Sequence, residues 1–238
     1  MARLTELPRI ECLLLADLVL PPDHPAATEA RETPVFGYLI HHPDGVILVD
    51  TGVGRGNAFI DEAYRPTVVD LEDALADRGV DHRDVVAVVN SHLHFDHCGQ
   101  NPGFYGLSVP VYVQSREVEA AAQPHYTDPT WATVPSAQLR SVRGDEDLAD
   151  GVRLMATPGH TAGHQSVVVE GPAGVVVIAA QSVWSVSEFE TMEPDDTNIG
   201  HEDLREAAAD SIRRLRALNP SAALFSHDPT VYRPSPVS

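Results

Sequence analysis

The stretch "NSHLHFDHCGQN" at residues 90–101 holds three histidines and one aspartate within six positions. His92 and His94 alternate, so on an extended segment both imidazoles face the same way. Asp96 and His97 are adjacent and can turn toward a neighbouring point. Neutral imidazole and carboxylate are ligands of zinc, and also of iron, manganese or nickel. The stretch therefore predicts a metal site.

Two further histidines lie where a strand is expected to give way to a loop. His160 belongs to "TPGHTAGH", and His227 belongs to "AALFSHD" at residues 222–228. The apolar run at residues 84–90 directly precedes the first histidines, as expected of a buried strand that ends at a site. We expect the histidines from all three places to converge on one edge of the sheets.

The elements that must position these residues follow from the apolar pattern. An Asp-Gly turn at residues 43–45 indicates a hairpin, and helical spacing indicates helices. Strands are predicted at 10–20, 35–42, 46–52, 84–90, 109–114, 151–171, 174–184 and 222–228, and helices at 67–79, 115–122 and 201–218, with loops at 21–34 and 123–147. Strands come first and then mix with helices, which predicts two sheets with helices outside.

Length and composition limit the function. The chain has 238 residues, 43% of them hydrophobic, and we expect a single domain over residues 1–238. No apolar run is long enough for a membrane span. The net charge of −19 argues against nucleic acid as a substrate. Cys12 and Cys98 make no disulfide framework, and residues 10–20 do not have the form of a signal peptide, so a cytoplasmic protein is expected.

These motifs give the chain a clear resemblance. "PVFGYLI", "ILVDTG", "SHLHFDHCGQN", "TPGHTAGHQSVVV" and "FSHD" occur in the order found in the metallo-β-lactamase fold hydrolases. Within that family, the sequence resembles the branch of quorum-quenching N-acyl homoserine lactonases. The resemblance covers nearly the whole chain and implies an α+β fold, an αβ/βα four-layer sandwich with two mixed sheets and a metal site at one edge.

The resemblance also implies roles for individual residues. Asp50 would orient the ligands, and His164 would be structural. Asp96 would pass a proton to the leaving alkoxide while metal-activated water attacks the acyl carbonyl. The first metal ion would be bound by His92, His94 and His160, and the second by Asp96, His97 and His227.

Two positions depart from the family's pattern. Where the family has a metal-bridging aspartate, this chain has Gln181, and where the lactonases have a tyrosine that helps hold the substrate carbonyl, it has Trp184. An amide brings no charge to a pair of cations. We therefore expect one tightly bound ion, zinc or another divalent transition metal, and a second that is weak or absent. Both residues are candidate catalytic groups beside Asp96.

Other residues near the motif admit two interpretations. Cys98 is read as a small residue packed beneath the loop rather than as a ligand. Residues 123–147 could form a lid or a plain surface connection. Five aromatic residues could line an apolar acyl pocket or fill the core, namely Phe104, Tyr105, Tyr126, Trp131 and Trp184.

The sequence thus predicts a metallohydrolase that opens a neutral or apolar lactone or related ester. Gln181 and Trp184 together keep open an alternative, a non-hydrolytic metal-dependent biosynthetic enzyme that performs an elimination, rearrangement or cyclisation. A binding protein with a remnant site is the third alternative. The expected partner is a small acyl compound, with no nucleic acid and no membrane, and a homodimer stays open as the assembly.

Overall fold

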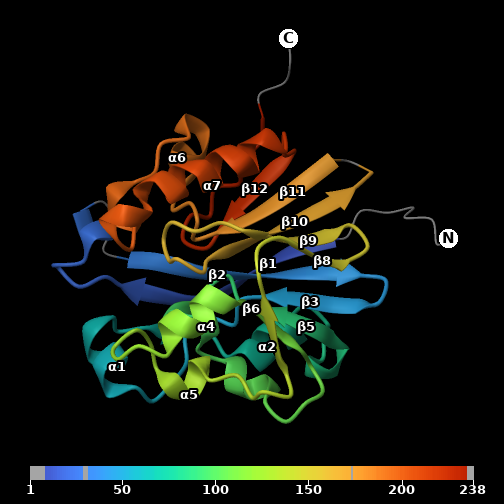
Figure 1. The fold of residues 1–238 in the computed structure, drawn as a ribbon. Helices are drawn as coiled ribbons and strands as arrows, with labels where there is room; N and C mark the ends of the chain where they lie inside the picture. The colour runs from blue at the N-terminus through green and yellow to red at the C-terminus, as the bar shows by residue number, and fades with distance from the viewer. Residues whose placement is uncertain (1–8, 29–31, 173, 235–238) are drawn as a thin grey trace. The chain divides into compact units, whose positions relative to one another are not determined.

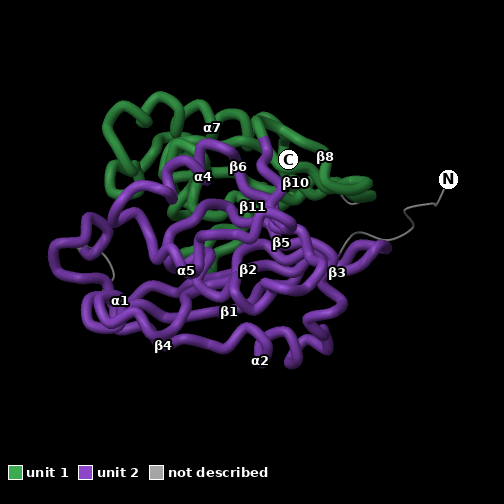
Figure 2. The backbone as a smooth tube through the Cα atoms, turned by 60° about the horizontal axis from the view of Figure 1, so that its bottom comes forward, with its two compact units in different colours: residues 1–8, 143–238 green, residues 9–142 purple. Residues whose placement is uncertain are grey.

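The computed structural model describes residues 9–28, 32–172 and 174–234. The chain divides into two compact units (Figure 2), which we call the N-terminal unit (residues 9–142) and the C-terminal unit (residues 143–234). Each unit contains one β-sheet and the helices that pack on it. The prediction of a single domain over residues 1–238 is not tested by this division and stays a prediction.

The N-terminal unit is built on a mixed sheet of seven strands in the order β4-β1-β2-β3-β5-β6-β7. Strands β4, β1, β2 and β3 are antiparallel neighbours, and β3, β5, β6 and β7 run parallel. The strands are β1 (Arg9–Val19), β2 (Glu32–His42), β3 (Gly45–Val49), β4 (Thr67–Val68), β5 (Val85–Val89), β6 (Val111–Gln114) and β7 (Leu139–Val142).

The hairpin between β2 and β3 forms at the Asp-Gly turn, as predicted. Gly45 has φ +134°, a backbone conformation that favours glycine. Val46, Leu48 and the central residues of β1 and β2 enter the buried apolar cluster of the N-terminal unit. Strands β3 and β5 end side by side, and the segments that follow them carry Asp50 and His92.

Five α-helices belong to the described part of the N-terminal unit. Leu71, Ala74 and Leu75 of α2 pack in the same apolar cluster as the sheet, and α2, α4 and α5 lie on one side of the sheet in Figure 1. The helices are α1 (Ala58–Ala63), α2 (Leu71–Ala76), α3 (Phe95–Cys98), α4 (Ser115–Ala121) and α5 (Pro129–Ala132).

The C-terminal unit is built on a mixed sheet of five strands in the order β12-β11-β10-β9-β8, of which only β11 and β12 are parallel. Ile212 and Leu215 of α7 pack on one face of this sheet with Phe225 and Val177. The elements are β8 (Glu146–Ala149), β9 (Val152–Ala156), β10 (Gln165–Gly171), β11 (Gly174–Ala180), α6 (Val186–Thr191), α7 (Arg205–Ala217) and β12 (Ala222–Phe225).

Some local predictions were wrong. Residues 67–68 of the predicted helix 67–79 form strand β4 instead, because they pair with Ala16 and Asp17 of β1. The predicted loop 123–147 contains α5, β7 and the start of β8. Helices α1 and α6 were not predicted. Of the predicted loop 21–34, residues 25–28 form a 3-10 helix, β2 begins at Glu32, and residues 29–31 lie outside the described residues.

The predicted strand region 151–171 forms two strands, β9 and β10, with residues 157–164 between them, and the short helix α3 was not predicted. The remaining elements agree with the sequence pattern to within a few residues, and two mixed sheets are confirmed. Within the described ranges, none of the helices has the length and apolar character required to cross a membrane.

Candidate metal centre

The ligand candidates of the N-terminal unit follow strand β5. His92 and His94 lie on an extended segment, and His92 Nε2 is 3.0 Å from His94 Nδ1. Asp96 and His97 lie in the single turn of α3, where Asp96 Oδ2 is 3.5 Å from His97 Nε2. The sequence prediction that these residues form neighbouring pairs is therefore supported within this unit.

Asp50 orients this segment from the end of β3. It has φ +61°, a left-handed conformation that costs energy for a residue other than glycine. Asp50 Oδ1 accepts a hydrogen bond from the Ser91 backbone N–H at 2.7 Å, and Oδ2 accepts one from Ser91 Oγ at 2.7 Å. His97 Nδ1 lies 2.8 Å from the same Oδ2. One buried carboxylate thus fixes the β5 end and the ring of His97.

The contact with Asp50 determines which nitrogen of His97 can bind a cation. A carboxylate oxygen can only accept, so Nδ1 carries the hydrogen and Nε2 is turned toward Asp96. Burial by itself lowers the pKa of His97, but the charges of Asp96 and Asp50 and their hydrogen bonds outweigh burial and raise this pKa to about 10. The two carboxylates therefore favour positive charge at this imidazole, whether as a proton or as a bound cation.

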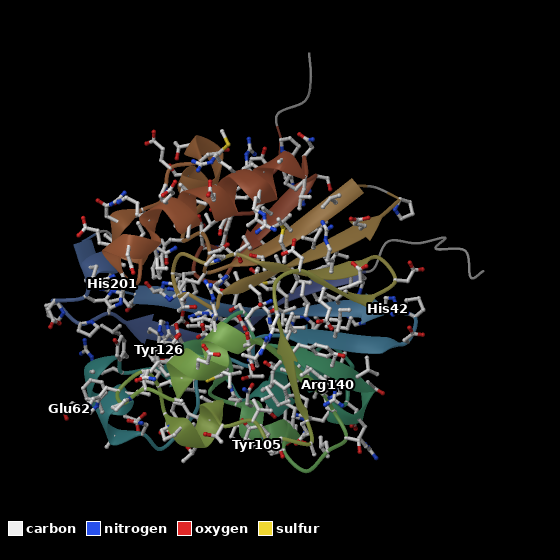
Figure 3. The ribbon with its side chains drawn as sticks, viewed as in Figure 1. His42, Glu62, Tyr105, Tyr126, Arg140 and His201 are labelled. Carbon is white, nitrogen blue, oxygen red and sulfur yellow. The ribbon has the colours of Figure 1, made fainter. Side chains whose placement is uncertain are left out.

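A second carboxylate supports the segment from behind. Glu117 of α4 is fully buried, and its Oε1 accepts a hydrogen bond from the Leu93 N–H at 2.8 Å. Tyr126, labelled in Figure 3, donates its hydroxyl to the same oxygen, and its ring lies 4.8 Å from that of His94. Leu93 stands between His92 and His94, so Glu117 and Tyr126 restrain both histidines.

A close approach of two loops completes this half of the site. A Cβ atom added to Gly99 would lie 1.9 Å from the backbone nitrogen of Gly54, so only glycine fits there. The Gly99 N–H donates to the Gly52 carbonyl at 2.7 Å. Cys98 is buried, its Sγ lies 3.4 Å from the Leu93 carbonyl, and burial raises the pKa of its thiol. An inert packing residue is what these contacts support.

In the C-terminal unit, His160 is held by a backbone carbonyl. Its Nδ1 lies 2.9 Å from the carbonyl oxygen of Asn198, which can only accept, so Nδ1 carries the hydrogen and Nε2 is the atom that can bind a metal. Gly200 packs directly against His160, since a Cβ atom there would lie 2.0 Å from the His160 carbonyl oxygen.

Gln181 follows a distorted strand end. Ala180 has φ +52°, and the register between β11 and β12 shifts between Ile178 and Ala180. Such irregularities redirect the side chains that follow. The side chain of Asn198 donates to the Gln181 carbonyl at 3.1 Å, so Asn198 connects Gln181 to His160.

Trp184 and His227 are stacked, with ring centroids 4.6 Å apart and an angle of 26° between the rings. The backbone N–H of Trp184 donates to Glu188 Oε2 at 2.5 Å. Burial, only partly offset by backbone hydrogen bonds, raises the pKa of Glu188 to about 7. His164 lies in a buried hydroxyl network, where its Nδ1 is 2.9 Å from Thr157 Oγ1.

The donor atoms fit a divalent cation. Two ligands at zinc distances of about 2.05 Å in a tetrahedral arrangement lie roughly 3.3 Å apart. The two donor pairs of the N-terminal unit are 3.0 and 3.5 Å apart. His97 and His160 each engage Nδ1 with an oxygen acceptor, the usual support of a metal-binding imidazole.

Comparison with known proteins decides the family. The sequence model of the metallo-beta-lactamase superfamily matches residues 30–227. The chain belongs to the metallo-beta-lactamase superfamily. This membership confirms the predicted fold class, and the donor geometry fits a metal site.

Relatives within the superfamily are lactonases. An N-acyl homoserine lactonase from a Bacillus species is 30% identical over 218 residues, which cover 84% of this chain and 83% of the relative. The N-acyl homoserine lactonase AiiA of Bacillus thuringiensis subsp. kurstaki is 30% identical over 212 residues, covering 82% of this chain and 81% of AiiA. These relatives identify the chain as a metallo-beta-lactamase fold hydrolase.

Solved structures agree. A mutant of B. thuringiensis AiiA with N-decanoyl-L-homoserine at its active site has a TM-score of 0.79 and 26% identity, covering 94% of this chain and 95% of AiiA. An N-acyl homoserine lactone hydrolase with N-hexanoyl-L-homoserine bound at its catalytic metal centre gives the same values. These similarities do not support the non-hydrolytic alternative.

Several residues of the site were not predicted. Three groups hold metal-ligand candidates or their neighbours through tertiary contacts, namely Glu117, Glu188 and the carbonyl of Asn198. No sequence motif identifies such contacts. For Glu188 a partial signal exists, since Ser185 and Glu188 have the spacing of a helix capping box. Of the five aromatic residues, Phe104 and Trp131 lie in the buried apolar cluster of the N-terminal unit, which favours core filling for these two.

Proposed function

We propose that this chain opens the ring of an N-acyl homoserine lactone or a closely related neutral lactone by metal-dependent hydrolysis. The observation that carries the proposal concerns two of the candidate ligands. An oxygen acceptor lies beside Nδ1 of each ring, from Asp50 at His97 and from the Asn198 carbonyl at His160, which leaves Nε2 of each ring for a metal ion. The lactonase relatives supply the substrate class.

The ligand set that we propose joins residues of both units. One ion would be held by His92, His94 and His160, and the other by Asp96, His97 and His227. Zinc is proposed because imidazole and carboxylate suit it, although other divalent transition metals share these preferences. When bound, such a cation lowers the pKa of water toward about 7 and polarises the acyl carbonyl.

The chain's own residues would do the remaining work. Asp96, which is largely buried, would take the proton from the attacking water and give it to the leaving oxygen of the lactone. The indole N–H of Trp184 is a donor that would hold the substrate carbonyl in place of a phenol. Gln181 would direct an uncharged amide toward the cations.

The missing carboxylate at position 181 bears on the number of ions. Two divalent ions about 3.5 Å apart repel by roughly 19 kcal/mol at an effective dielectric constant of about 20. Anionic ligands must offset this repulsion. Asp96 is the one carboxylate in the proposed ligand set, so we propose one tightly bound ion and a second that is weak or absent.

The substrate should be neutral at its reacting end and apolar in its acyl chain, because a net charge of −19 disfavours anionic compounds. A cytoplasmic location and a homodimeric assembly remain proposals that rest on the sequence.

The test is lactone hydrolysis by purified protein, followed by product mass and by acid release. Activity should be lost in chelator and return with zinc, and the product should be heavier by one water. His92→Ala should abolish activity, whereas His201→Ala, at an exposed histidine paired with Asp203, should not. Zinc-loaded protein that opens no acyl homoserine lactone above background would refute the proposal. A product of unchanged or lower mass would instead favour non-hydrolytic chemistry.

A further inference from the structure

Glu188 is a buried carboxylate with no cationic partner among the described residues. It lies in the first turn of α6 and is 5% exposed. Its Oε2 accepts the Trp184 N–H at 2.5 Å, and its Oε1 accepts the Asp195 N–H at 2.9 Å. A buried carboxylate is costly unless its oxygens are satisfied, and here both are satisfied by backbone donors of two separate segments.

The arrangement differs from an ordinary capping box. Ser185 is the N-cap residue of α6, and its Oγ accepts the Glu188 N–H at 3.3 Å. In a capping box the glutamate reaches back to the N–H of the cap residue itself. Glu188 instead reaches one residue farther, to Trp184, and also across to Asp195. Helix capping alone does not account for these contacts.

Both segments that Glu188 holds lead to the proposed reaction site. Trp184 stacks on His227. Asp195 caps the short 3-10 helix Asp196–Asn198, whose last residue contacts His160 through its carbonyl and Gln181 through its side chain. The Glu188 carboxylate therefore holds the two segments whose residues contact His160, Gln181 and His227.

We propose that Glu188 is a positioning residue, which in its ionised form holds Trp184 and the segment 195–198 in the arrangement that the reaction requires. This inference rests on the proposed function. Protonation would place a hydrogen on an oxygen that faces a backbone N–H, so one of the two segments would be released. The result would be a site in which His160 and His227 are less firmly oriented.

Glu188 ionises near neutral pH, since burial raises its pKa to about 7. Glu190 of α6 itself and Glu193 just after the helix are exposed, and further charged and titratable groups approach α6 from neighbouring segments. Asp195 adds negative charge from the next segment, Asp228 accepts the Val186 N–H at 2.8 Å, Arg216 of α7 lies over the ring of Phe189, and His227 stacks on Trp184.

The test compares Glu188→Gln with Glu190→Gln, a matched change at an exposed glutamate of the same helix. An amide can accept only one of the two N–H groups. We expect Glu188→Gln to raise the zinc dissociation constant by about 10-fold or more and to lower kcat for lactone opening more than it changes KM. Glu190→Gln should match the wild type in both. Equal zinc affinity and equal kcat in Glu188→Gln and wild type would overturn the inference.

A second measurement needs no turnover. In a Trp131→Phe background Trp184 is the sole tryptophan, so its emission reports the stack on His227. Zinc-loaded protein should show an emission change centred near pH 7 that Glu188→Gln removes. A transition that persists in Glu188→Gln, or no transition in the background protein, would contradict the inference. Because emission and zinc affinity are independent of the substrate, an inactive protein would refute the proposed function alone.

Discussion

Replacement of Asp50 by asparagine tests how the structure prepares His97 for metal binding. The carboxylate accepts three hydrogen bonds, from the N–H and Oγ of Ser91 and from His97 Nδ1. In either orientation of an asparagine side chain, its NH2 group faces a donor. One orientation loses the Ser91 N–H bond, and the other turns the hydrogen of His97 to Nε2, where a metal should bind.

The direction of the effect follows from the charge that the site favours. Against the effect of burial, the carboxylates of Asp96 and Asp50 raise the pKa of His97 to about 10, so the site favours positive charge at this ring. Asp96 and Asp50 share this effect. Loss of Asp50 alone should weaken metal binding by about 10- to 100-fold, the usual effect of removing the hydrogen-bond partner of a metal-binding imidazole.

The assay is competition for zinc between the protein and a chromophoric chelator. Asp61→Asn, at an exposed aspartate of α1 in the same unit, removes the same charge far from these contacts and should bind zinc as the wild type does. If Asp50→Asn binds zinc within about threefold of the wild type, the argument that Asp50 sets the hydrogen of His97 is wrong.

Three further predictions concern other parts of the chain. Gln181→Asp should raise the zinc content from one toward two ions per chain by metal analysis, and equal content in both proteins would contradict the charge argument. Glu188 has a pKa raised from 4.5 to about 7, so its contribution to stability is present below pH 4.5 and is lost as the pH rises through 7. Urea denaturation in chelator should compare the unfolding free energies of Glu188→Gln and wild type. The variant's value minus the wild-type value should rise by about 3 kcal/mol between pH 4.5 and 8. A difference that does not change with pH would count against the buried charge. Gly99→Ala should lower the unfolding free energy by several kcal/mol, because the added Cβ would meet the Gly54 nitrogen at 1.9 Å, and a variant as stable as wild type would exclude this close packing.

The sequence predicted the parts of the fold that depend on local pattern. The apolar run of β5, the hairpin turn at Gly45 and the dense histidine motif are all written in consecutive residues, and the structure has them in place. Strand β4 was missed because Thr67 and Val68 become a strand only by pairing with β1, a contact that helical spacing in the same window concealed.

The supporting residues of the site were harder to predict for a related reason. Asp50 was identified by resemblance. Its left-handed backbone and its hydrogen bonds with Ser91 form only when the ends of β3 and β5 are adjacent, which the sequence alone does not show. In sequence Glu117 reads as an ordinary acidic residue of the first turn of a predicted helix, and Glu188 lies where no helix was predicted. Their burial, which gives them their role, is a property of the packed chain.

The two proposed ligands whose hydrogens are fixed by oxygen acceptors differ in how easily mutation can disturb them. The acceptor for His97 is a side chain, which a single codon change at position 50 removes. The acceptor for His160 is a main-chain oxygen, which every amino acid at position 198 would supply as long as the loop keeps its path. Substitution at position 198 would therefore keep the His160 acceptor and remove only the side-chain bond to the Gln181 carbonyl, whereas substitution at position 50 removes the His97 acceptor itself.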